Sequence, residues 1–268
     1  MIDLTRKVTV PVLADFKTSG VPITMLTAYD FSLARRVDEA GVDCVLVGDS
    51  LGNVIQGQDS TLPVTVDDMV YHTAAVAQGL KRALLVADLP FMSYHDRATA
   101  MASAAALMRA GASMVKLEGG SPMVDIVRAL VEQGIPVCAH LGLTPQHVHR
   151  LGGYRVQGRE QALADALVAD AKALEAAGAP LLVVECIPNA LAERVTQALS
   201  IPVIGIGAGA GVDGQVLVCY DMLGISTGRL PRFVRDFMIG AESIPEALQH
   251  FVEAVRARQF PSADESYE

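Results

Sequence analysis

Eight short apolar runs rich in β-branched residues recur along this chain, each bounded by Gly, Asp or Pro. They are continuously apolar and do not alternate, which is typical of parallel strands buried on both faces. Alanine-rich segments with helical spacing of their apolar residues separate them. The eight predicted strands cover residues 23–28, 44–48, 83–88, 113–118, 136–140, 181–185, 202–206 and 215–220.

This alternation predicts an α/β fold, a single-domain (β/α)8 TIM barrel, because eight such units in 268 residues match the usual size of that barrel. An open doubly wound sheet is the alternative, disfavoured because no G-x-G-x-x-G opens a helix after the first strand. No linker divides residues 1–268, so we expect one domain with a short N-terminal extension. We interpret the polar C-terminal tail, about residues 260–268, as a frayed end.

Local signals predict several helix ends. Gly41, Gly111 and Gly178 precede predicted strands, where a helix C-terminus commonly takes a left-handed residue. Residues 61–68 predict a helix N-terminus with an acidic residue at the third helical position. Apolar spacing places Leu163 on the buried face of a later helix.

Composition narrows the classes of function. The chain is 51% hydrophobic and 19% charged, which excludes a disordered protein, and its net charge of −9 disfavours nucleic-acid or membrane partners. The N-terminal segment has acidic residues and no apolar core, so we expect a cytoplasmic protein without a membrane span. Its four cysteines lie in scattered positions without a C-x-x-C pair, which predicts buried, reduced thiols.

Ionisable residues stand where five of the predicted strands end. A single carboxylate there is more often a turn or a helix cap. In a parallel barrel, however, the C-terminal strand ends form the active site, so five such ends predict a shared site. The residues are Asp49 with Ser50, Asp88, Lys116 with Glu118, His140 and Glu185.

Three of these acids form a candidate metal site. Asp49, Asp88 and Glu118 offer hard oxygen ligands without a thiolate beside them, which favours Mg²⁺ over zinc. His140 more often donates a hydrogen bond to substrate or orients a ligand than binds the metal itself. Lys116 and Glu118, two residues apart on one strand, face the same side and bring a cation and an acid together. An ordinary buried ion pair is the alternative for these two residues.

Two loops carry weaker signals. Residues 205–211, GIGAGAG, have no Lys, Arg or Ser to complete a phosphate site, so we interpret them as a tight turn against the substrate. Residues 143–159 form a long loop that mixes Gly, His, Arg and Tyr. Long loops on the catalytic face tend to act as lids or subunit contacts.

Nine segments resemble those of ketopantoate hydroxymethyltransferases, the 3-methyl-2-oxobutanoate hydroxymethyltransferases of pantothenate synthesis. The segments are VLVGDSLG, QGQDSTLPVTVDDMVYHTAAV, ADLPFMSY, MVKLEGG, AHLGLTPQ, GGYRVQGR, VVECIP, IPVIGIGAG and DGQVLVCYDMLG, within residues 22–235. The resemblance implies a (β/α)8 barrel with Mg²⁺, with 5,10-methylenetetrahydrofolate as co-substrate, and a homo-oligomer, commonly a decamer.

The resemblance also implies a role for each candidate residue. Metal binding falls on Asp49, Asp88 and Glu118, and proton abstraction falls on Glu185. Substrate contacts fall on Asp49, Ser50, Asp88, Lys116 and His140.

The implied reaction transfers a hydroxymethyl group to 3-methyl-2-oxobutanoate through a Mg²⁺-stabilised enolate and gives 2-dehydropantoate. A keto acid can chelate Mg²⁺, which polarises the ketone and makes the neighbouring C–H acidic. The alternative enzyme is a Mg²⁺-dependent 2-oxo-acid lyase or mutase of the isocitrate-lyase kind, but no K-K-C-G-H type loop is present. A non-catalytic binding barrel is disfavoured because it has no need for buried charge.

Overall fold

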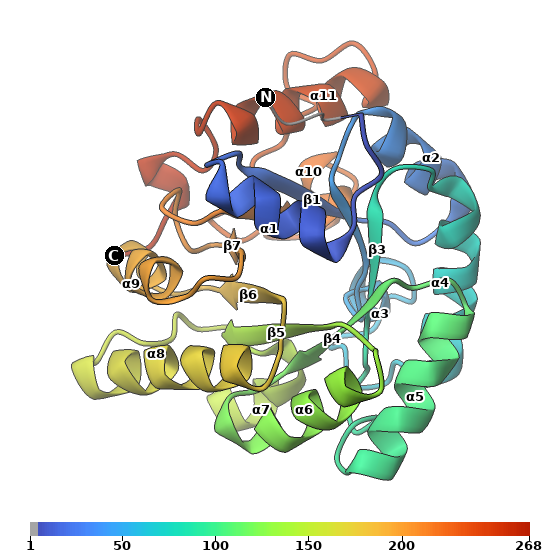
Figure 1. Cartoon of the computed structure of the whole chain (residues 1–268). Helices are drawn as coiled ribbons and strands as arrows, with labels where there is room; N and C mark the ends of the chain where they lie inside the picture. Colours follow the sequence, from blue (N-terminus) through green and yellow to red (C-terminus); the bar gives the residue numbers. More distant parts are fainter. Residues whose placement is uncertain (1–4) are drawn as a thin grey trace.

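The computed structural model describes residues 5–268 as a closed barrel of eight parallel strands in sequential order (Figure 1). Residues 1–4, where the predicted domain begins, lie outside the described residues. The strands are β1 (Ile23–Thr27), β2 (Cys44–Val47), β3 (Leu84–Asp88), β4 (Met114–Glu118), β5 (Val137–Gly142), β6 (Leu181–Glu185), β7 (Val203–Ile206) and β8 (Gly214–Leu217). The predicted fold class is confirmed.

Helices surround the strands in a ring (Figure 1). The α-helices are α1 (Val10–Thr18), α2 (Phe31–Glu39), α3 (Leu51–Val54), α4 (Val66–Gly79), α5 (Arg97–Arg109), α6 (Val124–Glu132), α7 (Val148–Leu151), α8 (Gln161–Ala176), α9 (Asn189–Ala198), α10 (Cys219–Met222) and α11 (Ile244–Arg256). Three 3₁₀ turns are η1 (Ser121–Met123), η2 (Pro145–His147) and η3 (Ala263–Glu265). None of the helices described in residues 5–268 combines the length and apolarity needed to cross a membrane.

The local sequence signals correctly mark helix ends. Gly41, Gly111 and Gly178 have φ of +86°, +115° and +102°, which a residue with a side chain adopts only with strain. Thr65 caps α4 in a capping box with Asp68, as the acidic third position predicts. The four cysteines are buried, as predicted, and none of them is in a disulfide.

Inward-facing side chains change from apolar to ionisable along the strands. On β3, Leu84 and Val86 belong to the cluster that fills the barrel, and Asp88 follows with the same two-residue period. The same order holds on β4, β5 and β6, where the last inward-facing residues are ionisable. The period of two therefore confines the charge to the C-terminal end of the barrel.

Helix α1 closes the opposite end of the barrel. Its Val12, Leu13 and Phe16 pack on the apolar interior of the strands. Beside it, the fully buried Asp43 lies 2.7 Å from guanidinium nitrogens of Arg82 and Arg256. The N-terminal end is thus sealed by apolar packing and ion pairs, and the open end is the one that carries the ionisable residues.

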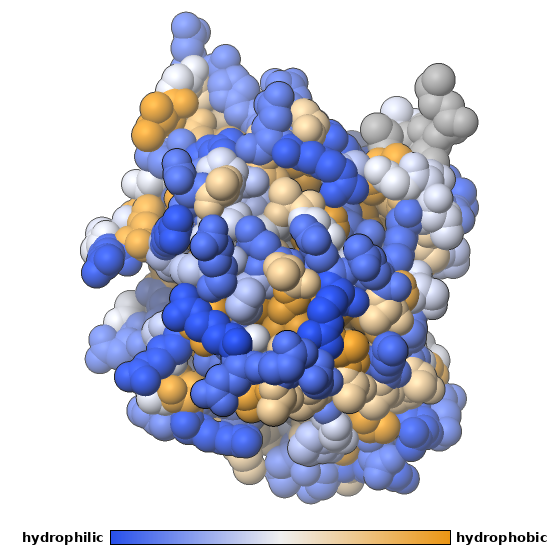
Figure 2. All heavy atoms as spheres, turned by 90° about the vertical axis from the view of Figure 1, so that its left-hand side faces the viewer, coloured by the Kyte–Doolittle hydropathy of each residue, from blue (hydrophilic) through white to orange (hydrophobic). Residues whose placement is uncertain are grey.

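The predicted buried face of α8 is wrong in one position. Leu163 is 55% exposed, whereas Ala164, Leu167 and Leu174 are buried. Leu163 lies at the edge of the buried stripe, because Ala164, the next residue in the same turn, takes the covered position. Figure 2 shows this side of the molecule, with α8, α9 and the C-terminus, as mostly hydrophilic with small separate apolar patches.

The C-terminal tail is ordered, which corrects the interpretation of a frayed end. Phe260 is buried, and the carboxylate of Glu265 accepts two 2.7 Å hydrogen bonds from Arg235. The carbonyl of Tyr267 accepts a 3.0 Å hydrogen bond from the backbone N–H of Asn189. The polar composition misled the prediction because these polar groups form hydrogen bonds with the rest of the protein and not with water.

Candidate active site

One large cavity of about 1050 Å³ opens at the C-terminal ends of the strands. It brings together side chains from β2, β3, β4, β5 and β6 and the segments that follow them. All seven predicted site residues line it: Asp49, Ser50, Asp88, Lys116, Glu118, His140 and Glu185.

Lys116 and Asp88 form a buried ion pair on the cavity floor. Strand register places them side by side on β3 and β4, and Nζ of Lys116 lies 2.6 Å from Oδ1 of Asp88. Burial lowers the pKa of Lys116, but Asp88, Glu118 and Asp49 outweigh it and raise the pKa above its ordinary value. The lysine is therefore an ammonium with donors left for a substrate anion. The alternative of an ion pair with Glu118 is replaced by this pair with Asp88.

Gln146 of η2 connects the acids, and the sequence did not indicate this role. Its Nε2 donates to Oδ2 of Asp49 at 2.8 Å, and its backbone N–H donates to Oε2 of Glu118 at 3.0 Å. The hydroxyl of Tyr94 donates to Oε1 of Gln146 at 2.5 Å, which orients the amide. Both residues lie in the segments AHLGLTPQ and ADLPFMSY, but nothing in the spacing marks them as partners of the acids.

His140 lies between two carboxylates. Its Nδ1 is 3.2 Å from Oε1 of Glu118, and its Nε2 is 3.2 Å from Oε2 of Glu185. The second contact lacks the alignment of a good hydrogen bond, so Nε2 is a buried donor without a well-placed acceptor. Burial and Lys116 lower the pKa of His140, but the two carboxylates outweigh them and raise it to about 9.

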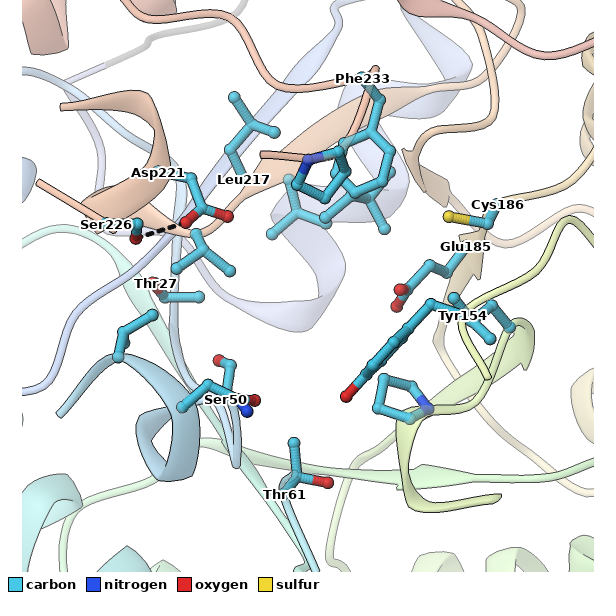
Figure 3. Close-up of a pocket in the computed structure, with 18 of the residues that line it drawn as sticks. Thr27, Ser50, Thr61, Tyr154, Glu185, Cys186, Leu217, Asp221, Ser226 and Phe233 are labelled. Atoms are coloured by element: carbon cyan, nitrogen blue, oxygen red, sulfur yellow. Dashed lines mark hydrogen bonds between the residues drawn. The ribbon is translucent and has the colours of Figure 1, made fainter. Parts of the chain in front are cut away.

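The turn after β6 directs Glu185 into the cavity (Figure 3). Cys186, the next residue, has φ of +47°, which is rare for a residue with a side chain. Gly142 on β5 lies against the same backbone, since a Cβ there would stand 2.2 Å from the carbonyl oxygen of Glu185. A close strand approach and a strained turn therefore fix the direction of this carboxylate.

The carboxylates on the cavity floor outnumber the cations beside them. Burial, then the charges of Asp88 and Glu118, raise the pKa of Asp49 well above its ordinary value. Glu118 differs, because His140 and Lys116 outweigh burial and lower its pKa. Excess buried carboxylate of this kind fits a bound divalent cation.

The donor types fit Mg²⁺. Within residues 5–268, however, no three His, Cys, Asp or Glu side chains stand together as a ready-made metal site. Mg²⁺ usually keeps several waters and binds one or two protein carboxylates together with substrate oxygens. The arrangement is suited to such a partial shell, and metal binding by Asp49, Asp88 and Glu118 stays a prediction.

Aromatic side chains from three segments line the cavity above the acids. Tyr154 comes from the long loop after α7, Phe233 from the segment before α11, and Tyr267 from the C-terminal tail. The rings of Phe233 and Tyr267 meet edge to face at 6.5 Å. A Cβ at Gly207 would stand 2.7 Å from Phe233, so the glycine-rich turn packs against this wall. Sequence reasoning missed Phe233 and Tyr267, because neither follows a strand.

A family model for ketopantoate hydroxymethyltransferase matches residues 7–263. This chain belongs to the ketopantoate hydroxymethyltransferase family. The match covers all eight strands and the first residues of the ordered tail, and it ends before Tyr267. The predicted family, and with it the prediction of an enzyme, is confirmed.

Curated relatives agree with this membership of the ketopantoate hydroxymethyltransferase family. A 3-methyl-2-oxobutanoate hydroxymethyltransferase of Marinobacter nauticus is 57% identical over 97% of this chain and 98% of its own length. Another, from Shewanella loihica, is 56% identical over 97% of this chain and 99% of its own. Similarity at this level extends over nearly the whole of each chain.

Solved structures share the fold of this ketopantoate hydroxymethyltransferase family member at low identity. A 2,3-dimethylmalate lyase of the PEP mutase/isocitrate lyase superfamily superposes with a TM-score of 0.59 at 20% identity, covering 84% of this chain and 83% of the lyase. A phosphonopyruvate hydrolase gives 0.61 at 13% identity, covering 79% and 80%. These likenesses concern the barrel alone, so they do not favour the alternative of a lyase or mutase.

Proposed function

We propose that the protein transfers a hydroxymethyl group from 5,10-methylenetetrahydrofolate to 3-methyl-2-oxobutanoate and forms 2-dehydropantoate and tetrahydrofolate. One water is consumed, and its oxygen becomes the new hydroxyl. The observation that carries the proposal is the placement of the Glu185–His140 contact and the Lys116–Asp88 pair in one cavity. A base and an anion-binding cation are what the activation of a keto acid requires.

The keto acid binds on the cavity floor in this proposal. Lys116 keeps one donor on Asp88 and offers the others to the carboxylate or ketone oxygen of the substrate. Ser50, whose Oγ lies 2.8 Å from the hydroxyl of Tyr29, offers a further polar group at the edge of the cavity. These two contacts would hold the substrate with its C3–H facing Glu185.

Asp49, Asp88 and Glu118 are the residues that would hold Mg²⁺. When bound, the cation supplies Lewis-acid polarisation of the ketone, which lowers the pKa of the C3–H. Gln146 orients two of these acids through its amide and its backbone N–H. Such supporting hydrogen bonds commonly tune metal sites.

Glu185 is the base that removes the C3 proton. Its side chain is 15% exposed and points into the cavity, so it is partly desolvated and faces the substrate (Figure 3). The charged His140 attracts this carboxylate, and its Nε2 lies 3.2 Å from Oε2 of Glu185. As the C3–H bond breaks, its electron pair becomes available to bond the one-carbon unit.

The proposal is tested by proton NMR of 3-methyl-2-oxobutanoate in D₂O. We expect C3–H exchange with Mg²⁺, loss of exchange with EDTA, and 2-dehydropantoate once methylenetetrahydrofolate is added. Exchange without product would contradict folate as the donor. Product formation without any dependence on Mg²⁺ would contradict the cation.

We also propose an assembly and a compartment for the protein. The family resemblance predicts a homo-oligomer, commonly a decamer, and we propose a cytoplasmic protein with small molecules as its other partners. Light scattering on the purified protein measures the subunit number directly. A monomer at micromolar concentration would contradict the predicted assembly.

A further inference from the structure

A carboxylate that the proposed chemistry does not use lines the cavity on the side opposite Glu185. It belongs to Asp221 in α10, just after β8 (Figure 3). Oδ1 accepts a 2.6 Å hydrogen bond from Oγ of Ser226. Within the described chain, no cation forms an ion pair with Asp221, and no donor other than Ser226 reaches its carboxylate.

Leaving this carboxylate half-buried is unfavourable without a ligand. Burial raises the pKa of Asp221, and the Ser226 hydroxyl offsets only part of that effect. A buried acid is normally paired or fully hydrogen-bonded. Its free oxygen faces the cavity, so the missing donor can come from a molecule bound there.

A purely structural role explains the side chain only in part. Asp221 lies in the first turn of α10, but that helix has no side-chain cap. The bond to Ser226 ties the segment after α10 to the helix, yet a neutral Asn could accept the same bond. The charge is therefore unexplained by the fold.

The cavity around Asp221 offers apolar surface and room for a ring system. Leu217, Val218 and Ile225 line the wall beside the carboxylate, together with the ring of Tyr220. The cavity of about 1050 Å³ is also far larger than a five-carbon keto acid needs. This part of the cavity therefore combines apolar side chains with one charged hydrogen-bond acceptor, the carboxylate of Asp221.

We propose that Asp221 binds the 2-amino-4-oxopyrimidine edge of the folate co-substrate. That edge presents a ring N–H and an adjacent amino group as a planar pair of donors. A carboxylate accepts such a pair in the same forked geometry that it uses with a guanidinium group. This inference rests on the proposed function, since it assigns the co-substrate of that reaction to one side of the cavity.

The first experiment measures tetrahydrofolate binding by calorimetry, with no keto acid present. We expect Asp221→Asn to weaken binding about 10- to 100-fold, because hydrogen bonds to a charged acceptor are lost. Asp125→Asn, at a carboxylate that is 68% exposed on α6, is the matched control and should bind like the wild type. Ser226→Ala, which removes only the orienting hydroxyl, should weaken binding by a smaller factor.

A second measurement first compares two ligands on the wild-type protein, and that comparison does not depend on how a variant folds. A 2-desamino analogue of tetrahydrofolate lacks one of the two donors. We expect it to bind at least about 10-fold more weakly than tetrahydrofolate. Asp221→Asn should lose most of this discrimination.

The outcomes separate this inference from the proposed function. Equal binding of tetrahydrofolate by the wild type and Asp221→Asn, or equal binding of the analogue, overturns the role of Asp221 while the transfer reaction stands. A wild-type protein that neither binds tetrahydrofolate nor forms product overturns both. C3–H exchange of the keto acid should persist in Asp221→Asn, and its loss would show that the substitution disturbs the cavity as a whole.

Discussion

Nε2 of Gln146 donates a 2.8 Å hydrogen bond to Oδ2 of Asp49, a residue 97 positions earlier in the chain. The backbone N–H of the same glutamine donates to Glu118. One residue on a loop therefore sets the positions of two acids that come from different strand ends. The arrangement of the acids depends on that loop as much as on the barrel.

Gln146→Leu should weaken Mg²⁺ binding without unfolding the protein. Loss of a supporting hydrogen bond in a metal site costs about 10- to 100-fold in metal affinity. Titration of turnover against Mg²⁺ measures the change, and Gln161→Leu on the exposed start of α8 serves as the control. An unchanged Mg²⁺ dependence would show that Gln146 does not orient the metal ligands.

Asp88→Asn should abolish turnover at every Mg²⁺ concentration and also lower the stability. Asp88 accepts hydrogen bonds from Lys116 and from the backbone N–H of Asp49, so the substitution leaves a buried ammonium without its anion. Breaking a buried pair costs about 3–5 kcal/mol. Steady-state rates and urea unfolding measure the two effects. Near-normal activity at limiting Mg²⁺ would remove Asp88 from the metal site.

Glu185→Gln should stop C3–H exchange even when folate is absent. The amide keeps the size of the side chain but cannot take a proton at neutral pH. General bases contribute about 10²- to 10⁴-fold, so the NMR exchange rate should fall by that factor. Exchange at the wild-type rate would mean that another group is the base.

Tyr267→Ala should reduce kcat/KM because it removes part of the cavity wall. The ring of Tyr267 packs edge to face on Phe233, and such a contact contributes about 0.5–1.5 kcal/mol. We expect a loss of about 2- to 10-fold, from that energy. Tyr71→Ala, at a ring that is 72% exposed on α4, is the control. Equal kinetics for the two variants would show that the tail has no part in the site.

Asp43→Asn should destabilise the protein without changing its chemistry. The carboxylate is fully buried between Arg82 and Arg256 at the closed end of the barrel. Loss of its charge should lower the free energy of unfolding by about 3 kcal/mol, from the cost of breaking a buried pair. Urea unfolding measures this change, while KM for both substrates should stay at the wild-type value.

Periodicity in the sequence was sufficient to predict the barrel and most of the residues of the site. Each strand is a local pattern, and the two-residue period decides which side chains face inward. Asp88, Lys116, Glu118, His140 and Glu185 lie at the ends of such patterns, so they could be grouped before any contact was known. Asp49 and Ser50 follow β2 after a single residue, so they could be grouped with the others in the same way.

The residues that support the site escaped prediction because their role exists only as a contact. Gln146 and Tyr94 meet across segments that are 52 positions apart, and neither has a local pattern of its own. Leu163 was predicted to be buried and is exposed. Apolar spacing on α8 does not show whether another element covers a given side chain.

By itself, the sequence determined the eight strands, which of their side chains face inward, the glycine turns and the family. Those features depend on local backbone preference and on short motifs, both of which a single chain carries in its order of residues. Only the tertiary structure decided that Lys116 pairs with Asp88, that Gln146 joins two acids, and that the polar tail places Tyr267 in the cavity wall. These depend on which distant groups meet once water is excluded, and hydrogen bonds made in that way leave no period in the sequence.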